Sequence, residues 1–461
     1  MITLELIKDY GTEDKLYKKG EQLCFNDHER QQAQELISEG IAEFHHQTEP
    51  TIENIKENIN QTFPELWKET EATLSVISAM QLKEMNDPIT LILVGAASSG
   101  KTTILSFYYE HETIFKSDNF TPKSFVSHAA NVKTEKLEEI DLLPKIKNKT
   151  FISPELAPIF GKGKEDTIEN FSILARVLDG EGFESDSGSK GHRGYSGEYK
   201  FTWLGATTPL EKNTWDTMSR IGHRILFINM DSFNREEDYY VKAFLEERPY
   251  AEKIKIMRSS VHNFLEKIKE TKLYSVKWNT KKDGELFKKI VRTALLVRLL
   301  RAKTSIWSER TEDGEMIYNY SKSLPESPER LISALYNISR GRALLYNRKQ
   351  LDEEDLELVY RIGFSSMPFD RSDLFFKLLK NGGLLTTEKT EEELKCTKAT
   401  ARKVMKVLEI LGIVNSTYEE MTKKHMSAIE LKKQFRWVLE DKKVLCLFEE
   451  VRNSYKKMRE K

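Results

Sequence analysis

The chain has 461 residues, which predicts two to four domains, and its 72 lysines and arginines nearly balance its 73 aspartates and glutamates. A net charge of −1 excludes a protein that is basic throughout, so any nucleic-acid surface must be a local patch. Three cysteines without metal-ligand spacing argue against a disulfide scaffold or a zinc site, and without a membrane span or signal peptide we expect a cytoplasmic protein.

The first part of the chain is predicted to hold a small module and a helical linker. Residues 1–48 combine a strand pattern at residues 2–6 with a helical stretch near residues 29–44. Residues 49–86 then carry apolar side chains at helical spacing, which predicts the linker.

An α/β core is predicted over residues 87–232. Residues 89–94 form a nearly continuous apolar run with β-branched side chains, as a buried parallel strand requires. Further strand candidates are residues 124–127, 149–153, 199–206 and 224–229. Their alternation with helical segments indicates a parallel sheet that helices cover on both faces.

The rest of the chain is predicted to be mostly helical. Residues 233–367 show apolar helix faces, interrupted by a polar loop at residues 308–328. Residues 368–445 have the pattern helix, helix, helix and strand, and residues 446–461 form a short basic tail.

A phosphate-binding motif directly follows the first buried strand. The pattern G-x-x-x-x-G-K-[ST] is matched by Gly95, Ala96, Ala97, Ser98, Ser99, Gly100, Lys101 and Thr102. The glycines let the backbone curl so that successive N–H groups point inward, and the following helix directs its positive dipole end at the same anion. Lys101 can reach the β- and γ-phosphates, and the Thr102 hydroxyl can ligate Mg²⁺. We therefore expect ATP and Mg²⁺ to bind at residues 95–103, Thr103 included; the alternative is a chance match in a turn.

A P-loop also needs a carboxylate on a neighbouring strand, to hold metal or to activate water. Glu155 stands where the strand of residues 149–153 ends, at the edge where open α/β sheets bind their ligands. We expect it to be both catalytic and a metal ligand, with Asp141 and Asp166 as fallbacks. The alternative is an exposed first-turn acid of a helix that Pro154 begins.

The order of these segments resembles the AAA+ ATPases, and within them the minichromosome-maintenance (MCM) helicases and the MCM-like helicases of mobile elements. After the P-loop strand come a strand ending in an acid, a helix, a glycine-rich insertion, the strand at residues 201–209 and the segment at residues 218–227. The resemblance covers about residues 87–445, and only the P-loop is specific by itself. It implies an AAA+ core with a helical lid over residues 233–367, assembled as a ring, expected to be a hexamer, with ATP between subunits.

The resemblance also implies individual roles. Thr207 or Thr208, of which we choose Thr208, resembles sensor 1, which orients the attacking water. Arg220 resembles the arginine that reaches the γ-phosphate of the neighbouring subunit, with Arg224 as the competing candidate. Pro154 departs from the family, where a second acid is usual at that place.

The sensor 2 arginine of the family lies at the start of a helix in the lid. Arg330, in the segment of residues 328–332, resembles it, which implies contact with the nucleotide. Arg340 and Arg342 lie on the same segment and are alternatives, and the competing interpretation is that such arginines solvate the outer face of the helix.

A β-hairpin is predicted at residues 181–200, where five glycines surround the basic residues Lys190, His192 and Arg193. Its position just before sensor 1 resembles the pre-sensor 1 hairpin, which projects into the ring channel and contacts DNA. Lys190 and Arg193 could meet phosphates, whereas the alternative is a surface loop in which acidic residues balance the charge.

Residues 368–445 resemble a winged helix. The predicted order is a first helix at residues 390–394, a recognition helix at residues 397–408, a strand after residue 412 and a wing strand at residues 433–439. One face of the recognition helix carries the cations Lys398, Arg402, Lys403 and Lys406. These suit contact with a DNA groove, and the alternative is a protein-docking module.

The sequence therefore predicts an ATP-dependent, ring-forming motor that translocates on single-stranded or forked DNA or unwinds it. One alternative is a nucleotide-regulated DNA-bound initiator, loader or transcription regulator that does not unwind. Another is a protein remodeller that uses the winged helix as an adaptor.

Overall fold

The computed structural model describes residues 2–447, apart from residues 7, 12–15, 20, 26–29, 45–49, 129–135, 161–163, 189–190, 220–221, 223, 231–240, 242–247, 305, 311–315 and 419–425. The chain divides into two compact units, Met1–Ile55 and Lys56–Lys461. Among the described helices, none combines the length and the hydropathy that a membrane span requires.

The first unit is a small sheet with one helix. Its elements are β1 (Ile2–Leu6), β2 (Tyr10–Gly11), β3 (Leu16–Tyr17), β4 (Gln22–Phe25), α1 (Arg30–Ser38) and β5 (Ala42–Phe44). The strands pair antiparallel in the order β4-β1-β5, and Leu6 and Leu36 are buried between sheet and helix. The helix predicted near residues 29–44 is therefore shorter, because β5 takes its last residues.

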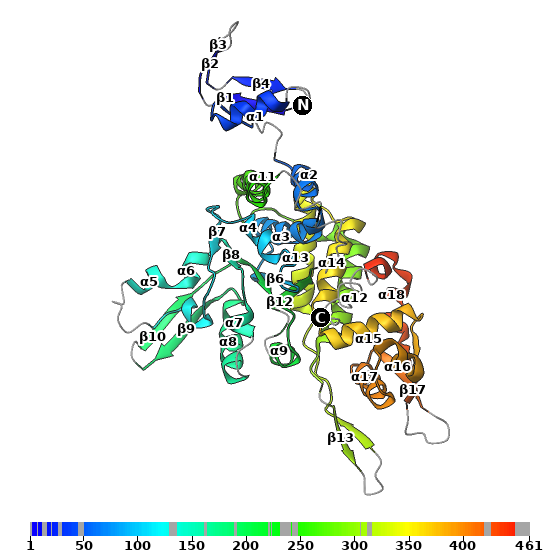
Figure 1. The fold of residues 1–461 in the computed structure, drawn as a ribbon. Coiled ribbons are helices and arrows are strands. Elements are labelled where there is room, and N and C mark those ends of the chain that lie inside the picture. Colours follow the sequence, from blue (N-terminus) through cyan, green and yellow to red (C-terminus); the bar gives the residue numbers. More distant parts are fainter. Residues whose placement is uncertain are drawn as a thin grey trace. The chain divides into compact units, whose positions relative to one another are not determined.

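The second unit is built around a five-stranded parallel sheet (Figure 1). Its strands are β6 (Ile89–Val94), β7 (Ile114–Lys116), β8 (Thr150–Ser153), β11 (Thr202–Thr207) and β12 (Ile225–Asn229), in the order β12-β6-β11-β8-β7. The predicted α/β core and its parallel sheet are confirmed. The strand expected at residues 124–127 is wrong, because Pro122 begins a 3-10 turn over Pro122–Phe125 and a proline has no N–H for a sheet ladder. The short strand β7 takes the edge position instead.

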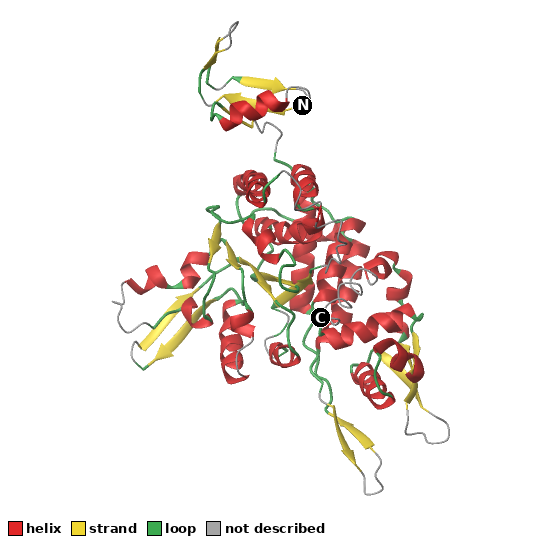
Figure 2. Ribbon diagram, in the orientation of Figure 1, coloured by secondary structure: helices red, strands yellow, loops and turns green. Residues whose placement is uncertain are grey.

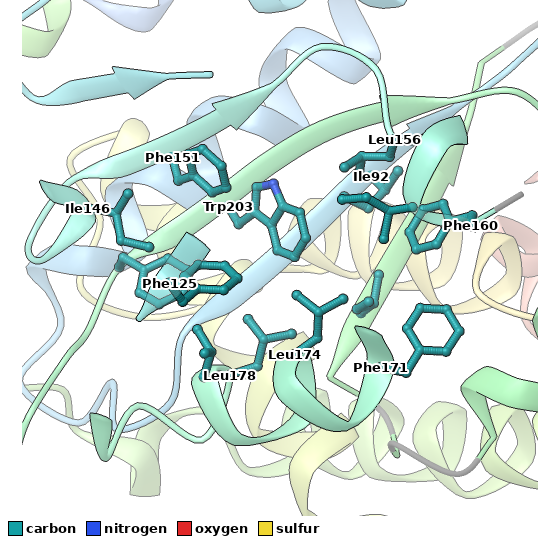
Figure 3. Packing of buried hydrophobic residues seen from close by; sticks show 14 of the residues in the cluster. Ile92, Phe125, Ile146, Phe151, Leu156, Phe160, Phe171, Leu174, Leu178 and Trp203 are labelled. Atoms are coloured by element: carbon teal, nitrogen blue, oxygen red, sulfur yellow. The ribbon is translucent and has the colours of Figure 1, made fainter. Parts of the chain in front are cut away.

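Helices cover both faces of this sheet. On one face lie α3 (Trp67–Ser78) and α4 (Lys101–Ser106), and on the other α7 (Ala157–Phe160), α8 (Lys164–Val177) and α9 (Lys212–Met218). Figure 3 shows the second layer, where Phe160 of α7 and Leu174 of α8 belong to the same buried cluster as Trp203 of β11. Every described side chain of β6 is buried, which explains the continuous apolar run in its sequence. Three further helices are α2 (Ile52–Thr62), α5 (Leu137–Ile140) and α6 (Leu142–Ile146).

A helical region follows the sheet. It comprises α11 (Tyr250–Glu270), α12 (Gly284–Arg301), α13 (Glu329–Leu345) and α14 (Glu353–Ser365). Its helices are integral with the core, since α13 packs closely on α3 and α14 packs on β12. A β-carbon placed on Gly341 of α13 would lie 2.1 Å from the backbone oxygen of Ser75 on α3, so only glycine permits this approach.

The close crossing of α3 and α13 leads to a stability prediction. We expect Gly341→Ala to lower the free energy of unfolding by about 1–3 kcal/mol, because the added methyl group forces two packed helices apart. Urea titration followed by circular dichroism measures the change. Gly284→Ala is the matched control, since a β-carbon on Gly284 meets nothing within 4 Å. Equal midpoints for the two variants would contradict the close packing.

Two β-hairpins project from the second unit (Figure 2). The first, β9 (Gly182–Ser187) paired with β10 (Gly191–Ser196), confirms the hairpin predicted at residues 181–200. The second, β13 (Ile306–Arg310) paired with β14 (Met316–Tyr320), lies between α12 and α13. The prediction of a loop at residues 308–328 is wrong where β13 and β14 lie. The polar composition of this segment conceals two strands that pair with each other.

The last part of the unit has helices and a three-stranded antiparallel sheet. Its elements are α15 (Phe369–Lys380), β15 (Leu384–Thr386), α16 (Thr387–Leu394), α17 (Lys398–Ile410), β16 (Val414–Tyr418), β17 (Met426–Leu431) and α18 (Trp437–Glu440). The strand that returns is β17, so the prediction of a strand at residues 433–439 is wrong. Those residues form a 3-10 turn and most of α18.

Candidate nucleotide-binding site

The P-loop lies at the carboxyl end of β6, between that buried strand and α4. The N–H of Gly95 donates to the carbonyl of Thr207 at 3.3 Å, which fixes the start of the loop against β11. At its end, a β-carbon on Gly100 would lie 2.7 Å from a methyl group of Leu66, so a larger residue would displace the loop from the core. The motif therefore has the strand, loop and helix context that phosphate binding requires.

Lys101 is buried at the mouth of this loop. Its Nζ donates to the carbonyls of Gly95 at 2.8 Å and Ala96 at 2.6 Å and lies 3.3 Å from Ser99 Oγ. Burial lowers the pKa of Lys101, and the carboxylate of Glu155 opposes this shift. The ammonium group therefore lies where the loop curls. A phosphate placed there would be a stronger hydrogen-bond acceptor than the carbonyls, because it is charged and they are neutral.

Glu155 and Thr208 reach the same edge of the sheet from the neighbouring strands. Glu155 is exposed two residues beyond β8, and the next residue, Leu156, donates its N–H to Ala206 of β11 at 2.9 Å. Thr208 is exposed just beyond β11, whereas Thr207 is buried within it. Of the two sensor 1 candidates, only Thr208 therefore lies outside the sheet, where it can face a ligand.

The alternative interpretation, in which Glu155 is an exposed acid at the start of a helix, agrees in part with the structure. The helix α7 begins at Ala157 rather than at Pro154, and the Ala157 N–H donates to Glu155 Oε1 at 2.8 Å. Glu155 is therefore an acceptor at a helix start and also a neighbour of Lys101. Of the fallback acids, Asp166 is exposed in the first turn of α8, and Asp141 is fully buried away from the loop.

One aromatic side chain at the P-loop was missed by sequence analysis. The hydroxyl of Tyr250, at the start of α11, lies 3.0 Å from Thr103 Oγ1 in the first turn of α4. Its ring meets Phe63 edge-on at 5.8 Å and is 59% exposed. Nothing in the local sequence signals this contact, since Tyr250 is far along the chain and no turn or motif ties it to the P-loop.

Arg330 is not at the P-loop. It lies beside Arg224 at the opposite end of β6, where both arginines and Asp87 line a small cavity. A six-residue strand separates its two ends by roughly 20 Å. Arg330 therefore lies too far from its own P-loop to contact a nucleotide held there, and its expected contact with the nucleotide stays a prediction. Arg330 could contact only a nucleotide that another chain binds.

The alternatives to Arg330 are structural. Arg342 is buried and pairs with Glu71 of α3 at 3.0 Å and with Asp355 of α14 at 2.9 Å. Arg340 is buried over the ring of Tyr336, with its guanidinium carbon 4.3 Å from the ring centre. Arg220 lies outside the described residues.

The hairpin places its basic residues differently from the prediction. Arg193 Nη2 pairs with buried Asp141 at 2.7 Å, and Tyr195 donates its hydroxyl to the same carboxylate at 2.6 Å. The guanidinium of Arg193 is thus fixed against the body, a position that does not favour its expected role as a DNA contact, which stays a prediction. His192 remains exposed, 3.1 Å from Asp186, and Lys190 lies outside the described residues.

The predicted cations of α17 lie on its surface to different degrees. Lys398 is exposed and 3.6 Å from Glu388, and Arg402 is half-buried. Lys403 is exposed beside a cavity of 150 Å³ between α9, α15 and α17. Lys406 is held by Glu409 and Tyr418 and is the least available of the four.

The donor set at the P-loop fits a magnesium triphosphate. The Thr102 hydroxyl and the Glu155 carboxylate would supply the oxygen ligands that Mg²⁺ prefers. Lys101 and the main-chain N–H groups supply the cationic and polar partners of the anion. No element has to be rearranged to bring these groups to one edge of the sheet.

The described residues thus combine a five-stranded parallel sheet with a P-loop after β6, an acid after β8 and a polar residue after β11. No family profile and no curated protein matches the chain.

Several solved structures resemble it weakly. A proposed ATPase from Cytophaga hutchinsonii is 12% identical over 75% of this chain and 96% of its own, with a TM-score of 0.32. A full-length MCM homologue from Methanopyrus kandleri is 11% identical over 77% of this chain and 65% of its own, with a TM-score of 0.37. SCCmec type IV Cch, described as an active helicase, is 10% identical over 85% of this chain and 72% of its own, with a TM-score of 0.37. At such low values no activity passes from these proteins to this chain.

Proposed function

We propose that the protein is an ATP-hydrolysing ring motor that translocates on or unwinds DNA. The observation that carries this proposal is the convergence of Lys101, Glu155 and Thr208 at the carboxyl edge of one parallel sheet. The groups there can hold a triphosphate, ligate a metal and orient a water, which together are what phosphoryl transfer to water requires.

Each residue has a distinct role in this proposal. Lys101 would turn from the loop carbonyls to the β- and γ-phosphates, and Thr102 would offer its hydroxyl to Mg²⁺, whose charge would neutralise the phosphate oxygens. Glu155 accepts a proton from, or orients, the attacking water, and Thr208 donates a hydrogen bond beside it. The exposed ring of Tyr250 offers a stacking surface for the nucleotide base.

A ring follows from the separation of the P-loop and the arginines. Arg224 and Arg330 lie at the amino end of β6, and Arg220 is near Arg224 in sequence. The P-loop at one end of the sheet and the arginines at the other support a site completed head to tail by another copy. A head-to-tail interface whose rotation closes generates a ring, expected here to be a hexamer.

The DNA contacts are proposed for two surfaces. The order α15-β15-α16-α17-β16-β17 supports a winged helix, in which Lys398, Arg402 and Lys403 of α17 would contact DNA phosphates. The β9–β10 hairpin would add His192 and Lys190, with Arg193 fixing the hairpin rather than touching DNA.

The test is strand separation on a forked DNA duplex. We expect the wild type to unwind it with ATP and Mg²⁺, and Glu155→Gln to lose at least about 100-fold in rate while still binding nucleotide, because only the water-activating group is lost. Glu165→Gln is the matched control, since Glu165 is exposed on α8 and lies outside the site.

Two results would change the proposal. ATP hydrolysis that depends on Glu155 but separates no strands would favour the nucleotide-regulated DNA-bound scaffold. If the wild-type protein neither assembles nor hydrolyses ATP in the presence of nucleotide and DNA, the proposal of an ATPase is contradicted.

A further inference from the structure

Asp179 is a single carboxylate that binds both arginines at the amino end of β6. Its Oδ1 lies 3.0 Å from Arg224 Nε, 2.9 Å from Arg224 Nη2 and 2.8 Å from Arg330 Nη2. The side chain of Asp179 is 13% exposed, and those of Arg224 and Arg330 are 18% and 33% exposed. A third arginine, Arg176, reaches the other oxygen at 3.4 Å but is largely exposed. The two half-buried arginines are therefore the main partners of this charge.

Asp179 also stands at the root of the β9–β10 hairpin. It follows the last turn of α8, and the next residue, Gly180, accepts the N–H of Tyr199 at 2.8 Å and so closes the hairpin base. Gly180 and Gly182 have φ values of 74° and 90°, which side chains other than glycine rarely adopt. The hairpin thus joins the body through a short segment that has glycines on both sides of Glu181.

A second polar attachment of the hairpin lies further along its strands. Arg193 and Tyr195 of β10 bind the buried carboxylate of Asp141, which also accepts the N–H of Ser127 at 2.7 Å. This second anchor does not involve either arginine of the cavity. Two different carboxylates therefore contact the hairpin: Asp179 at its root and Asp141 at its strands. Of the two, Asp179 is the one that also binds Arg224 and Arg330.

We propose that Asp179 couples the nucleotide bound by a neighbouring copy to the position of the β9–β10 hairpin. This inference rests on the proposed function, in which Arg224 and Arg330 face the triphosphate of the next chain. A triphosphate carries more negative charge than one carboxylate and competes for the same guanidinium groups. When the arginines turn to the phosphates, Asp179 loses its main partners, and the glycine-flanked root is released while the Asp141 anchor holds.

The experiment compares Asp179→Asn with the matched control Glu181→Gln. Asp179→Asn keeps the shape of the side chain and removes its charge, whereas Glu181→Gln removes the same charge from an exposed neighbour. Hydrogen exchange of the amides of residues 180–199 is measured in the full-length chain, with and without a non-hydrolysable ATP analogue whose binding is followed by calorimetry. In the wild type and in Glu181→Gln, the analogue is expected to raise exchange in this segment severalfold. In Asp179→Asn, exchange is expected to be high already and to change little. Asp179→Glu, which keeps the charge, is expected to restore part of the response.

The outcomes separate the two proposals. If the analogue binds and the hairpin of Asp179→Asn responds as in the wild type, or if the wild-type hairpin does not respond, Asp179 couples nothing and the inference is overturned. If no analogue binds, the proposed function fails, and the exchange without nucleotide still decides whether Asp179 anchors the hairpin. Equal exchange in the wild type and Asp179→Asn would then overturn the inference as well.

Discussion

Replacing Lys101 with alanine is expected to lower kcat for ATP hydrolysis at least about 100-fold and to weaken ATP binding. The ammonium group is the cation at the mouth of the P-loop, where it already lies within 3 Å of two loop carbonyls. In the reaction it would stabilise charge that develops on the phosphates, and removing one such preorganised donor typically costs 10²–10³ in rate. Phosphate release at saturating ATP and Mg²⁺ measures the loss.

The control for this prediction is Lys123→Ala. Lys123 is a surface lysine that pairs with Glu169 at 2.8 Å, and exposed pairs of this kind contribute little to stability. We expect its hydrolysis rate to stay within about threefold of the wild type, in line with the small effects of surface substitutions. If the Lys101→Ala variant hydrolysed ATP at a similar rate, the P-loop would not be the catalytic site.

The part of the site that sequence analysis predicted well is the part built from neighbouring residues. The P-loop, the strand before it and the helix after it form one continuous segment, so the pattern of residues 89–102 contains the geometry itself. Glu155 and Thr208 could be located because each follows a buried strand, and parallel strands end at one edge of the sheet.

The roles of the arginines could not be predicted in the same way. An arginine on a helix or strand has the same local pattern whether it faces solvent, a ligand or a buried acid. Arg193 is fixed by Asp141, Arg342 by Glu71 and Asp355, and Arg330 by Asp179, and every one of these carboxylates comes from another element of the fold. Only the three-dimensional arrangement shows which carboxylate each arginine pairs with.

Long-range contacts of this kind also bear on whether the helical region can move as a lid. The resemblance implied a lid over the nucleotide, and such a lid is free to move only if few buried contacts hold it. Here Glu69 of α3 and Arg361 of α14 form a buried ion pair, and Gly341 lets α13 approach the backbone of α3. Within the described residues, α3, α13 and α14 therefore behave as one packed block. A nucleotide-driven movement is more easily accommodated by the hairpin root than by a rotation of these helices.

Asp355→Ala is expected to destabilise this block by about 3–5 kcal/mol, the usual cost of leaving a buried charge without its partner. Asp355 is fully buried and binds Arg342 at 2.9 Å and Arg348 at 2.8 Å. Its carboxylate also accepts the N–H of Asp352 at 2.9 Å and so closes the capping box at the start of α14. Hydrogen exchange of the α13 and α14 amides measures the free energy of local opening.

The matched control for this last substitution is Glu357→Ala. Glu357 lies on α14 two residues further along the chain and is exposed, so its removal should change the opening free energy by no more than about 0.5 kcal/mol. If both variants opened with similar free energies, the carboxylate of Asp355 would not hold α13 and α14 together, and a mobile lid would become the better description of these helices. A large loss confined to Asp355→Ala would instead mean that nucleotide-dependent movement has to leave this block intact.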